Sequence, residues 1–478
     1  MKMLISNKIT VAEYEPHFKR WVRQNYTIPN PEYITKVRLN KWIGSTPKEL
    51  KLYEDFGDYM VLPYGCLQAV YMYLIQTTDL NTVHIARDLN VDMKADWTSD
   101  TKIIPRDYQL TAVNQMVYHK YGILKAPCSS GKTVMGHLIA QKTGMRTLWL
   151  THTKELLNQS KAIGELMLGK TTGRVGTITD GKVNPGSVIT YATVQTMAKL
   201  DPKDYKHEYN CVVVDECHRC SKSASSYTQF SWVLSNVAAE YKYGLSATPE
   251  TKNGYGKSIT ANLGDIKYEI PKDVLEEEGT IMSVPVHPVI TTWKYPKSAF
   301  KSDGVLDFDK AVRFLHMDEN RNKMIAELIG DRPTLILSDN IDHLCYIANE
   351  LSEEQESVAC LVSTRHDENV LKADILCKHT PKAAAEYIEK MRSGELDIMF
   401  ATYQLAKEGL NIPRLEQVIL AFPAVDANII TQSVGRVARC CDGKEDAICY
   451  DLVDEPTWFQ KHWRERKKLY RNQGNEIV

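Results

Sequence analysis

The stretch that decides the fold is ILKAPCSSGKTVMG, residues 123–136. Its core approaches the phosphate-loop pattern G-x-x-x-x-G-K-[ST], with Ala126 at the position of the first glycine. Gly131 supplies a position without a side chain, where the phosphates can approach the backbone. Lys132 supplies a cation for the β- and γ-phosphates, and Thr133 supplies a hydroxyl for Mg²⁺. A buried strand before the loop and a helix after it, ending near Gly144, would aim the helix N-terminus at the phosphates. The stretch predicts a nucleotide site, although on its own it is also compatible with an ordinary Gly-Lys loop.

The loop itself would surround phosphate with backbone N–H groups. We expect ATP to contact Ala126, Pro127, Cys128, Ser129, Ser130, Gly131, Lys132 and Thr133.

Composition sets the broad class. The 478 residues are enough for about two to four domains, and 43% hydrophobic with 25% charged residues is typical of soluble globular proteins. No apolar run is long enough to span a bilayer, and the first residues lack the apolar region of a secretory signal, so we expect a cytoplasmic protein that is not secreted. Eleven cysteines without an export signal read as reduced thiols, and CHRC (217–220) lacks the second pair that a zinc site needs. With a formal net charge of −1, a nucleic-acid partner would need a local basic groove.

Hydrophobic patterning predicts an α/β fold with two parallel-sheet domains in tandem. In the first, strands are expected at 146–152, 175–180, 187–193, 211–216 and 243–248, with a helix over 154–168. In the second, they are expected at 334–339, 357–363, 396–402, 417–422 and 447–453. The weakly periodic segment 291–309 is expected to connect the two sheets.

The domain boundaries follow from these patterns. We expect a small α+β accessory domain over 1–99, an ATP-binding domain over 100–286, a second α/β domain over 287–456 and a basic helix over 457–478. The last segment, TWFQKHWRERKKLYRNQG (457–474), is either a DNA-contacting helix or a packed C-terminal cap.

An acidic pair ends one of the predicted strands. In NCVVVDECHRCS (210–221), Asp215 follows an apolar run at the carboxyl edge of the sheet that carries the phosphate loop, where Mg²⁺ would be held by Thr133 and Asp215. Glu216 can orient and deprotonate the attacking water. The alternative is a capped strand end. GLSATP (244–249), after the next strand, could sense the γ-phosphate through the acidic pair.

Two arginines in the second domain complete the predicted chemistry. In QSVGRVARC (432–440), Arg436 and Arg439 lie one helical turn apart and share a face. An arginine supplied across a cleft stabilises the charge on a transferred phosphoryl group. Two surface arginines are the alternative.

Taken in order, the phosphate loop, DECH, SAT and QSVGRVAR resemble the superfamily 2 helicases and translocases. The resemblance covers about residues 104–454 and implies two RecA-like domains that hydrolyse ATP with Mg²⁺. IPRDYQLTAV (104–113) resembles the adenine-recognition segment, which assigns Arg106 and Gln109 to the base. ATYQLAKEGLNIP (401–413) resembles motif V. The resemblance places four further residues near ATP: Glu408, Gly409, Asn411 and Gln432.

The same resemblance implies contacts with a nucleic-acid strand, mostly to phosphates and with low sequence specificity. LTHTKELLNQ (150–159) resembles motif Ia, ATVQTM (192–197) a further strand-contacting motif, and LSDNIDH (337–343) motif IV. The implied contact residues are Thr153, Lys154, Thr193, Gln195, Ser338 and Thr402.

The N-terminal segment narrows the resemblance. NPEY (30–33), KLYED (51–55) and LPYG (62–65) are similar to the front domain of small phage UvsW-like and XPB-like branch-migration helicases, with Tyr64 where those proteins carry an arginine. This implies forked or four-way-junction DNA as the partner, and no membrane; protein partners stay unassigned. A cluster in this domain either touches DNA or is an ordinary solvated face: Lys36, Arg38, Lys41 and Trp42.

Three alternatives remain open at this point. They are an RNA helicase, the motor subunit of a restriction-type complex, and a nucleotide-switched binding module that moves nothing.

Overall fold

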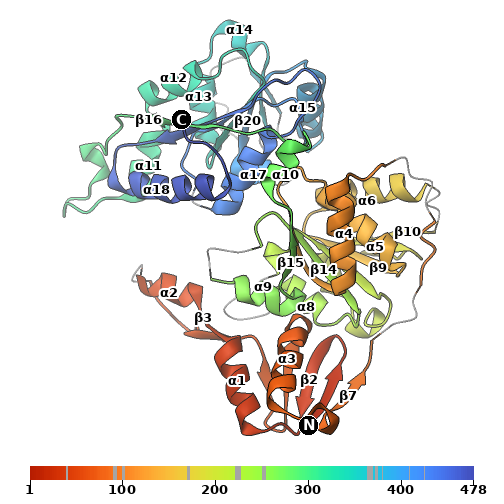
Figure 1. Ribbon diagram of the computed structural model, residues 1–478. Helices are drawn as coiled ribbons and strands as arrows, with labels where there is room; N and C mark the ends of the chain where they lie inside the picture. The colour runs from red at the N-terminus through yellow and green to blue at the C-terminus, as the bar shows by residue number, and fades with distance from the viewer. Residues whose placement is uncertain are drawn as a thin grey trace. The chain divides into compact units, whose positions relative to one another are not determined.

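The computed structural model describes the chain except residues 39–40, 90–93, 99–102, 170–172, 221–227, 250–253, 363–369, 372–374, 379–380, 408–409 and 425. The described residues form two compact units (Figure 1). The first comprises Met1–Pro127 and Gly131–Pro271; the second comprises Lys272–Val478, with which Cys128–Ser130 are grouped. The predicted α/β fold with parallel, RecA-like sheets is confirmed, because each unit contains a large sheet of mainly parallel strands.

The first unit begins with a mixed five-stranded sheet of order β5-β6-β2-β1-β7. Its strands are β1 (Lys2–Ile5), β2 (Lys8–Ala12), β5 (Glu54–Asp55), β6 (Tyr59–Pro63) and β7 (His84–Arg87). Alternating residues of β1 and β2 are buried against α1 (Pro16–Tyr26) and α3 (Leu67–Thr77), as expected for a sheet with one covered face. A short arm carries β3 (Thr27–Pro29), α2 (Pro31–Arg38) and β4 (Glu49–Lys51).

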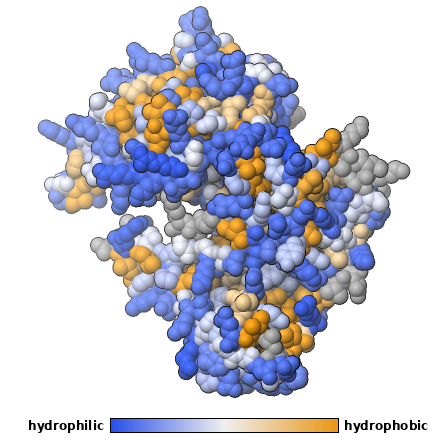
Figure 2. All heavy atoms as spheres, viewed as in Figure 1, coloured by the Kyte–Doolittle hydropathy of each residue, from blue (hydrophilic) through white to orange (hydrophobic). Residues whose placement is uncertain are grey.

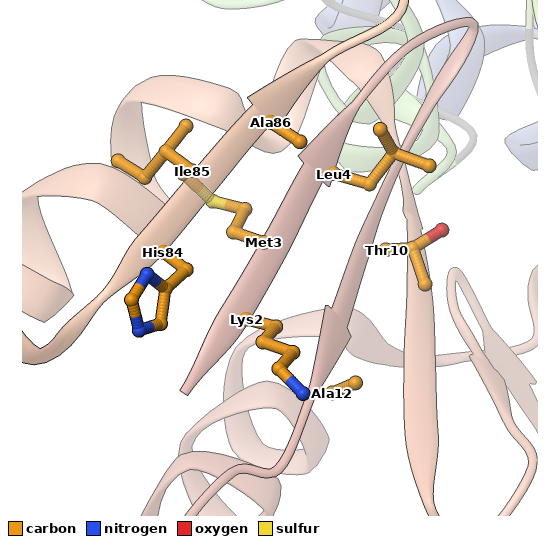
Figure 3. A pocket seen from close by; sticks show the side chains of 8 residues that line it. All are labelled: Lys2, Met3, Leu4, Thr10, Ala12, His84, Ile85 and Ala86. Atoms are coloured by element: carbon orange, nitrogen blue, oxygen red, sulfur yellow. The ribbon is translucent and has the colours of Figure 1, made fainter.

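The other face of this sheet carries the alternate residues of β1, of which Lys2 and Leu4 are exposed. A shallow pocket of about 310 Å³ lies there, and Figure 3 shows its lining side chains along β1, β2 and β7. They are Lys2, Met3, Leu4, Thr10, Ala12, His84, Ile85 and Ala86.

The nucleotide-loop sheet of the first unit has eight strands in the order β11-β10-β12-β9-β13-β14-β8-β15. The strands are β8 (Tyr121–Lys125), β9 (Thr147–Thr151), β10 (Val175–Thr179), β11 (Lys182–Asn184), β12 (Ile189–Thr193), β13 (Cys211–Asp215), β14 (Tyr241–Ser246) and β15 (Ile266–Glu269). All neighbouring pairs are parallel except β10 with β11. The central strands β9, β12 and β13 are buried along their whole length, which is why they read as continuous apolar runs.

Helices cover both faces of this sheet (Figure 1). One group is α4 (Asp107–His119), α5 (Lys132–Thr143) and α6 (Lys154–Leu168), and the other is α7 (Val194–Met197), α8 (Gln229–Leu234) and α9 (Gly256–Leu263). The helix after the phosphate loop ends where it was expected to end, because Gly144 adopts a φ of 70° and caps α5.

The second unit is built on a seven-stranded sheet, all parallel, of order β16-β22-β21-β17-β20-β18-β19. Its strands are β16 (Val286–Ile290), β17 (Thr334–Ser338), β18 (Ala359–Val362), β19 (Leu376–Lys378), β20 (Ile398–Thr402), β21 (Gln417–Leu420) and β22 (Ile448–Val453). The helices are α10 (Lys272–Glu277), α11 (Phe308–His316), α12 (Glu319–Glu327), α13 (Ile341–Ala348), α14 (Glu353–Glu356), α15 (Pro381–Ser393), α16 (Tyr403–Lys407), α17 (Ala427–Val437) and α18 (Thr457–Asn472).

The expectation that residues 291–309 connect the two sheets is wrong. Strand β16 precedes this segment and pairs with β22 along its full length, so the segment lies inside the second unit. The Thr291 hydroxyl even donates a hydrogen bond to the buried Asp454 carboxylate at 2.6 Å. The strand was missed because Pro288 interrupts its pattern, and a proline is tolerated there because β16 is an edge strand.

The N-terminal sheet is docked onto the nucleotide-loop sheet within the first unit. Lys242, fully buried on β14, lies with its Nζ 4.5 Å from the centre of the Tyr64 ring, and donates to the Leu234 carbonyl at 3.0 Å. Tyr64 donates in turn to the Glu240 carbonyl at 3.1 Å. A Cβ on Gly65 would lie 2.3 Å from the backbone nitrogen of Gly264, so these two segments meet backbone to backbone. Burial lowers the pKa of Lys242 to about 7.

A buried polar chain connects the phosphate-loop helix to the middle of the sheet. His137 Nδ1 lies 2.6 Å from the Thr133 carbonyl and His137 Nε2 lies 2.6 Å from the Tyr191 hydroxyl. Because a carbonyl only accepts, Nδ1 carries the proton and Nε2 accepts from Tyr191. Burial lowers the pKa of His137 to about 4, so the ring is neutral. Gly164 of α6 makes room for this hydroxyl, since a Cβ there would lie 1.7 Å from the Tyr191 oxygen.

Replacing Gly164 with alanine is therefore expected to destabilise the protein by about 2 kcal/mol through overpacking. The measurement is urea unfolding followed by tryptophan fluorescence. The double variant G164A/Y191F removes the oxygen that clashes and is expected to recover part of the loss. An unchanged unfolding midpoint for G164A would contradict the close contact.

Candidate nucleotide and nucleic-acid site

The phosphate loop links the end of β8 to the start of α5. Ala126 donates its backbone N–H to the Ser246 carbonyl at 3.0 Å, which ties the loop to β14. Gly131 adopts a φ of 77°, a conformation that a residue with a side chain rarely takes. Lys132 is the first residue of α5, and its Nζ donates to the Ala126 and Pro127 carbonyls at 3.3 and 3.1 Å. The ammonium group is thus held over the loop, where a phosphate could replace the carbonyls as its acceptor.

Gln109, assigned to the base by the resemblance, lies against this loop. A Cβ on Gly131 would lie 2.5 Å from Gln109 Nε2, so glycine is also required here for space. The Arg106 backbone N–H donates to Gln109 Oε1 at 3.1 Å, which fixes the amide at the start of α4. The structure therefore brings the two predicted parts of the nucleotide site together, while the Arg106 side chain is exposed.

The acidic pair follows β13. Asp215 is 6% exposed, and its pKa is raised to about 7 by burial first and by the neighbouring Glu216 second, while Lys132 opposes the rise. Glu216 has a φ of 52°, in the left-handed region that residues other than glycine rarely adopt. Such local strain is concentrated at functional sites, where it aims a side chain.

His218 is a functional candidate that the sequence reasoning missed. Its Nδ1 lies 3.2 Å from Glu216 Oε2 and 3.3 Å from Ser246 Oγ, and Ser246 Oγ accepts from the Thr248 backbone at 3.1 Å. His218 therefore joins the acidic pair to the SAT segment. Its position as the fourth letter of DECH is the sequence signal that could have indicated this role.

The donors present fit Mg²⁺ better than a metal held by protein alone. Among the described residues, no group of three or more His, Cys, Asp or Glu side chains is placed to hold a metal ion. Mg²⁺ is usually bound by one or two carboxylates together with substrate phosphates and water. Asp215 and Thr133 could supply such a site, and a cation there would offset the cost of ionising the buried Asp215.

Polar residues predicted to contact nucleic acid gather at the same carboxyl edge of the first unit's sheet. Thr151 and Thr193 are cross-strand partners at the ends of β9 and β12. Thr153 caps α6 by accepting from the Leu156 N–H at 3.3 Å, and Thr193 Oγ1 lies 3.1 Å from Thr196 Oγ1.

Lys154 and Gln195 flank these threonines. Lys154 forms an exposed ion pair with Asp180 at 2.5 Å, and the Gln195 amide donates to the His152 carbonyl at 2.7 Å. Both side chains lie at the surface, where a strand could replace their present partners.

The second unit places Ser338 and Thr402 side by side, as cross-strand partners at the ends of β17 and β20. Thr402 Oγ1 accepts from the Leu405 N–H at 3.4 Å. Ser338 is fully buried and its hydroxyl lies 2.8 Å from His343 Nδ1, so its side chain supports the strand end from within.

The two arginines and their neighbours lie on and after α17. Arg436 donates to the Ala406 and Leu410 carbonyls at 3.0 and 2.8 Å, which holds α17 against the end of motif V. Arg439 donates to the Asn411 side chain. Gln432 is 7% exposed, and its Oε1 has no hydrogen-bond partner among the described residues. Glu408 and Gly409, predicted to lie near ATP, are outside the described residues.

These features define a P-loop nucleoside triphosphatase with two tandem RecA-like sheets. The family profile described as "Type III restriction enzyme, res subunit" matches residues 102–251, and "Helicase conserved C-terminal domain" matches residues 320–441. Together the two matches span more than half of the chain. The chain belongs to the superfamily 2 helicases, and it is an ATP-hydrolysing helicase that binds nucleic acid.

Individual relatives are distant. A protein of Acanthamoeba polyphaga mimivirus, to which ATP-dependent RNA helicase activity is ascribed, is 28% identical over 74% of this chain and 64% of its own length. The ATP-dependent DNA helicase uvsW of Enterobacteria phage T4 is 23% identical over 78% of this chain and 73% of its own length. The structure of S. cerevisiae Dbp5 bound to RNA and ADP BeF3 shares the fold, with a TM-score of 0.53 at 13% identity over 78% of this chain and 90% of that one.

Membrane insertion was not expected from the sequence. Within the part of the chain that the structure describes, no helix combines the length and apolar character that a membrane crossing requires.

Proposed function

We propose that this protein uses ATP hydrolysis to move along and unwind DNA, and that its substrates are forks and four-way junctions read with low sequence specificity. The observation that carries this proposal is the single carboxyl edge of the first unit's sheet. It holds the phosphate loop, Asp215, Glu216 and Ser246 beside the strand-end threonines, so nucleotide chemistry and strand contacts share one scaffold. DNA as the substrate is supported by the phage T4 relative, a DNA helicase.

The geometry of the loop and the acidic pair supports the following nucleotide roles. Lys132 would move from the loop carbonyls to the β- and γ-phosphates, with backbone N–H groups of 126–133 surrounding them. Gln109 and Arg106 would recognise the base. Asn411 and Gln432 of the second unit keep the ATP-contacting role that the family resemblance implies. Thr133 and Asp215 would hold Mg²⁺, which neutralises developing phosphate charge. Glu216, with His218 beside it, would orient and deprotonate the attacking water.

Movement requires that strand contacts change during the ATP cycle. We propose that the first unit contacts the DNA strand through Thr153, Lys154, Thr193 and Gln195. The second unit would contact it through Ser338 and Thr402. Since Ser338 is buried, its contribution would come through its backbone N–H. Contacts of this kind carry little sequence information.

The N-terminal sheet and its arm are the proposed recognition element for duplex or junction. Trp42 is 88% exposed and Arg38 is exposed, whereas Lys36 is held by Glu32 at 2.8 Å. An exposed indole is suited to stacking on an unpaired base at a branch point.

Glu216→Gln is expected to lower ATP turnover about 10²-fold, because the amide keeps a hydrogen bond to His218 but cannot take a proton. ATP affinity should change little. Single-turnover hydrolysis and equilibrium binding of a fluorescent ATP analogue separate the two effects. Glu208→Gln, in an ion pair with Arg146 before β13, is the matched control. Near wild-type turnover would exclude Glu216 as the base.

The proposal is tested by ATPase stimulation and strand displacement on matched single strand, duplex, fork and four-way junction, each as DNA and as RNA. Stronger stimulation by DNA forks and junctions than by linear DNA supports it. Equal stimulation by linear duplex, without displacement, would indicate a translocating motor such as a restriction subunit. ATP binding with no displacement on any substrate would indicate a nucleotide-switched binding module.

RNA unwinding is the second candidate function, since RNA helicase activity is ascribed to the mimivirus relative. A preference for the RNA fork in the same assay would establish it and overturn the DNA assignment.

A further inference from the structure

Helix α18 has two faces of opposite character. Phe459, Trp463, Arg466 and Tyr470 are buried on one side, where Arg466 donates to both carboxylate oxygens of Asp451 at 2.7 and 2.9 Å. Tyr470 donates to the same carboxylate at 2.8 Å. The helix is therefore fixed on β22 by a buried ion pair to which Tyr470 adds a hydrogen bond, and its other face is held toward solvent.

Four basic residues form a stripe along that solvent face. Lys461, Arg464, Lys468 and Arg471 are all exposed and follow one another at intervals of three, four and three residues. This spacing keeps them on one side of the helix, opposite the buried residues. Figure 2 shows strongly hydrophilic surface where Figure 1 draws α18. We call these four residues the basic stripe.

The charge of the basic stripe is not compensated. Many surface cations of the second unit are paired, as Arg332 is with Asp446 and Arg414 with Asp397. None of the four stripe residues forms an ion pair with any described residue. Glu465 is the one acidic residue in the sequence of α18. In a chain whose net charge is −1, this is a local concentration of positive charge.

The stripe has the dimensions of a short nucleic-acid segment. From Lys461 to Arg471 the helix rises about 15 Å at 1.5 Å per residue. One strand of a duplex presents a phosphate about every 3.4 Å of its axis, so four cations face about four phosphates. The stripe also begins at the carboxyl edge of the sheet. Gln460 donates to the Asp454 carbonyl at 2.9 Å, just past the end of β22, and Ser338 and Thr402 end β17 and β20, two other parallel strands of the same sheet.

We propose that the basic stripe of α18 binds the phosphate backbone of the DNA on which the motor acts, outside the strand contacts of the helicase motifs. The inference rests on the proposed function for the identity of the nucleic acid. Binding is electrostatic, independent of sequence and strongly dependent on salt. It would keep the protein bound to the DNA while the contacts made by the helicase motifs are released.

The test is the full-length variant K461Q/R464Q/K468Q/R471Q. Fluorescence anisotropy with labelled single-stranded and duplex DNA is measured over a salt series. Losing four phosphate contacts at about 0.7 to 0.9 each should reduce the slope of log affinity against log salt by about 3, with at least a ~10-fold loss of affinity near physiological salt. ATPase without nucleic acid should not change, and neither should the thermal unfolding midpoint.

A control variant removes the same number of charges from scattered exposed sites. It is R20Q/K199Q/K203Q/K323Q. Its salt slope should stay close to that of the wild type; an equal loss in both variants would show a net-charge effect and overturn the stripe. Glu465→Gln should tighten DNA binding about 2-fold, a gain that misfolding would not produce.

Three further outcomes separate the possible failures. Wild-type protein that binds DNA with a slope identical to that of the stripe variant overturns the stripe and leaves the proposed function intact. Wild-type protein that binds neither DNA nor RNA overturns the proposed function. Unchanged DNA affinity, together with stripe-dependent binding to phosphatidylglycerol vesicles, would assign the stripe to an anionic lipid surface instead.

Discussion

Replacing Lys132 with alanine is expected to lower nucleic-acid-stimulated ATP hydrolysis by about 10³-fold or more, because the transferred phosphoryl group loses its nearest cation. Lys132 begins α5 and is held over the phosphate loop by two carbonyl acceptors, so its removal leaves the helix and the loop strand in place. DNA binding should remain measurable, since the strand-end threonines are untouched. Steady-state ATPase and DNA anisotropy on the same preparation check both halves of this expectation.

The matched control is Lys142→Ala, on the same helix. Lys142 lies in the last turn of α5, and its ammonium bonds to the Asn114 side chain rather than to the loop. Its loss should leave turnover within about 2-fold, as is usual for an exposed surface cation. Near wild-type turnover in K132A would show that the loop of residues 126–133 is not the phosphate site.

Arg439→Ala is expected to slow hydrolysis by about 10³-fold while weakening ATP binding only a few-fold. An arginine that meets the phosphoryl group in the transition state contributes mainly to kcat. Arg439 bonds to the Asn411 side chain, which the resemblance also places near ATP, whereas Arg436 is committed to the Ala406 and Leu410 carbonyls. Arg439 is therefore the better candidate for the transition-state role, and Arg436 for holding α17 in position.

Single-turnover hydrolysis and nucleotide-binding titrations separate these two arginines. Arg436→Ala should disturb stability as well as turnover, because two buried carbonyls lose their donor. Arg332→Ala, which breaks an exposed ion pair with Asp446, serves as the control and should change neither rate nor affinity. An equal loss of ATP affinity and of kcat in R439A would argue against a transition-state contact.

Much of the sheet architecture could be predicted, because central parallel strands are buried on both faces. The predicted strands around Leu150, Val213, Ile336 and Phe400 are all present, as continuous apolar runs between turn signals. The edge strands β11, β15, β16 and β19 were not predicted. They are short or partly exposed, and in β16 a proline hides the pattern, so their pairing comes from the tertiary fold rather than from local sequence.

The residues of the candidate site also differ in whether they could be predicted from the sequence. Gly131, Lys132 and Asp215 could be found because their chemistry is tied to a local pattern of strand, loop and helix. The DECH motif could have indicated a role for His218, but its contact with Ser246 could not be predicted, because it joins the ends of two neighbouring strands that only the fold brings together. The strand-end placement of Thr193 and Thr402 could be predicted. The burial of Ser338 could not, since a strand-end serine looks the same in sequence whether it faces solvent or a histidine.

The structure confirms one of the two interpretations of the C-terminal helix, and the other stays a prediction. The sequence offered a DNA-contacting helix or a packed cap, and the structure shows packing through Trp463 and Tyr470. The cations on the other face leave the DNA reading open to test. The amino-acid composition of α18 does not show that the helix has a buried face and an exposed face, because Arg466 is buried while Arg464 is exposed.

The backbone contact between Gly65 and Gly264 has a practical consequence. With Tyr64 packed against Lys242 and no room for even a methyl group at Gly65, the N-terminal sheet packs directly on the nucleotide-loop sheet. Tyr64 of the N-terminal domain packs against Lys242 of β14, which belongs to the nucleotide-loop sheet. A truncation that removes the first hundred residues would expose the buried ammonium group of Lys242 and the apolar surface around it. We therefore expect the truncated protein to aggregate before any change in catalysis can be measured.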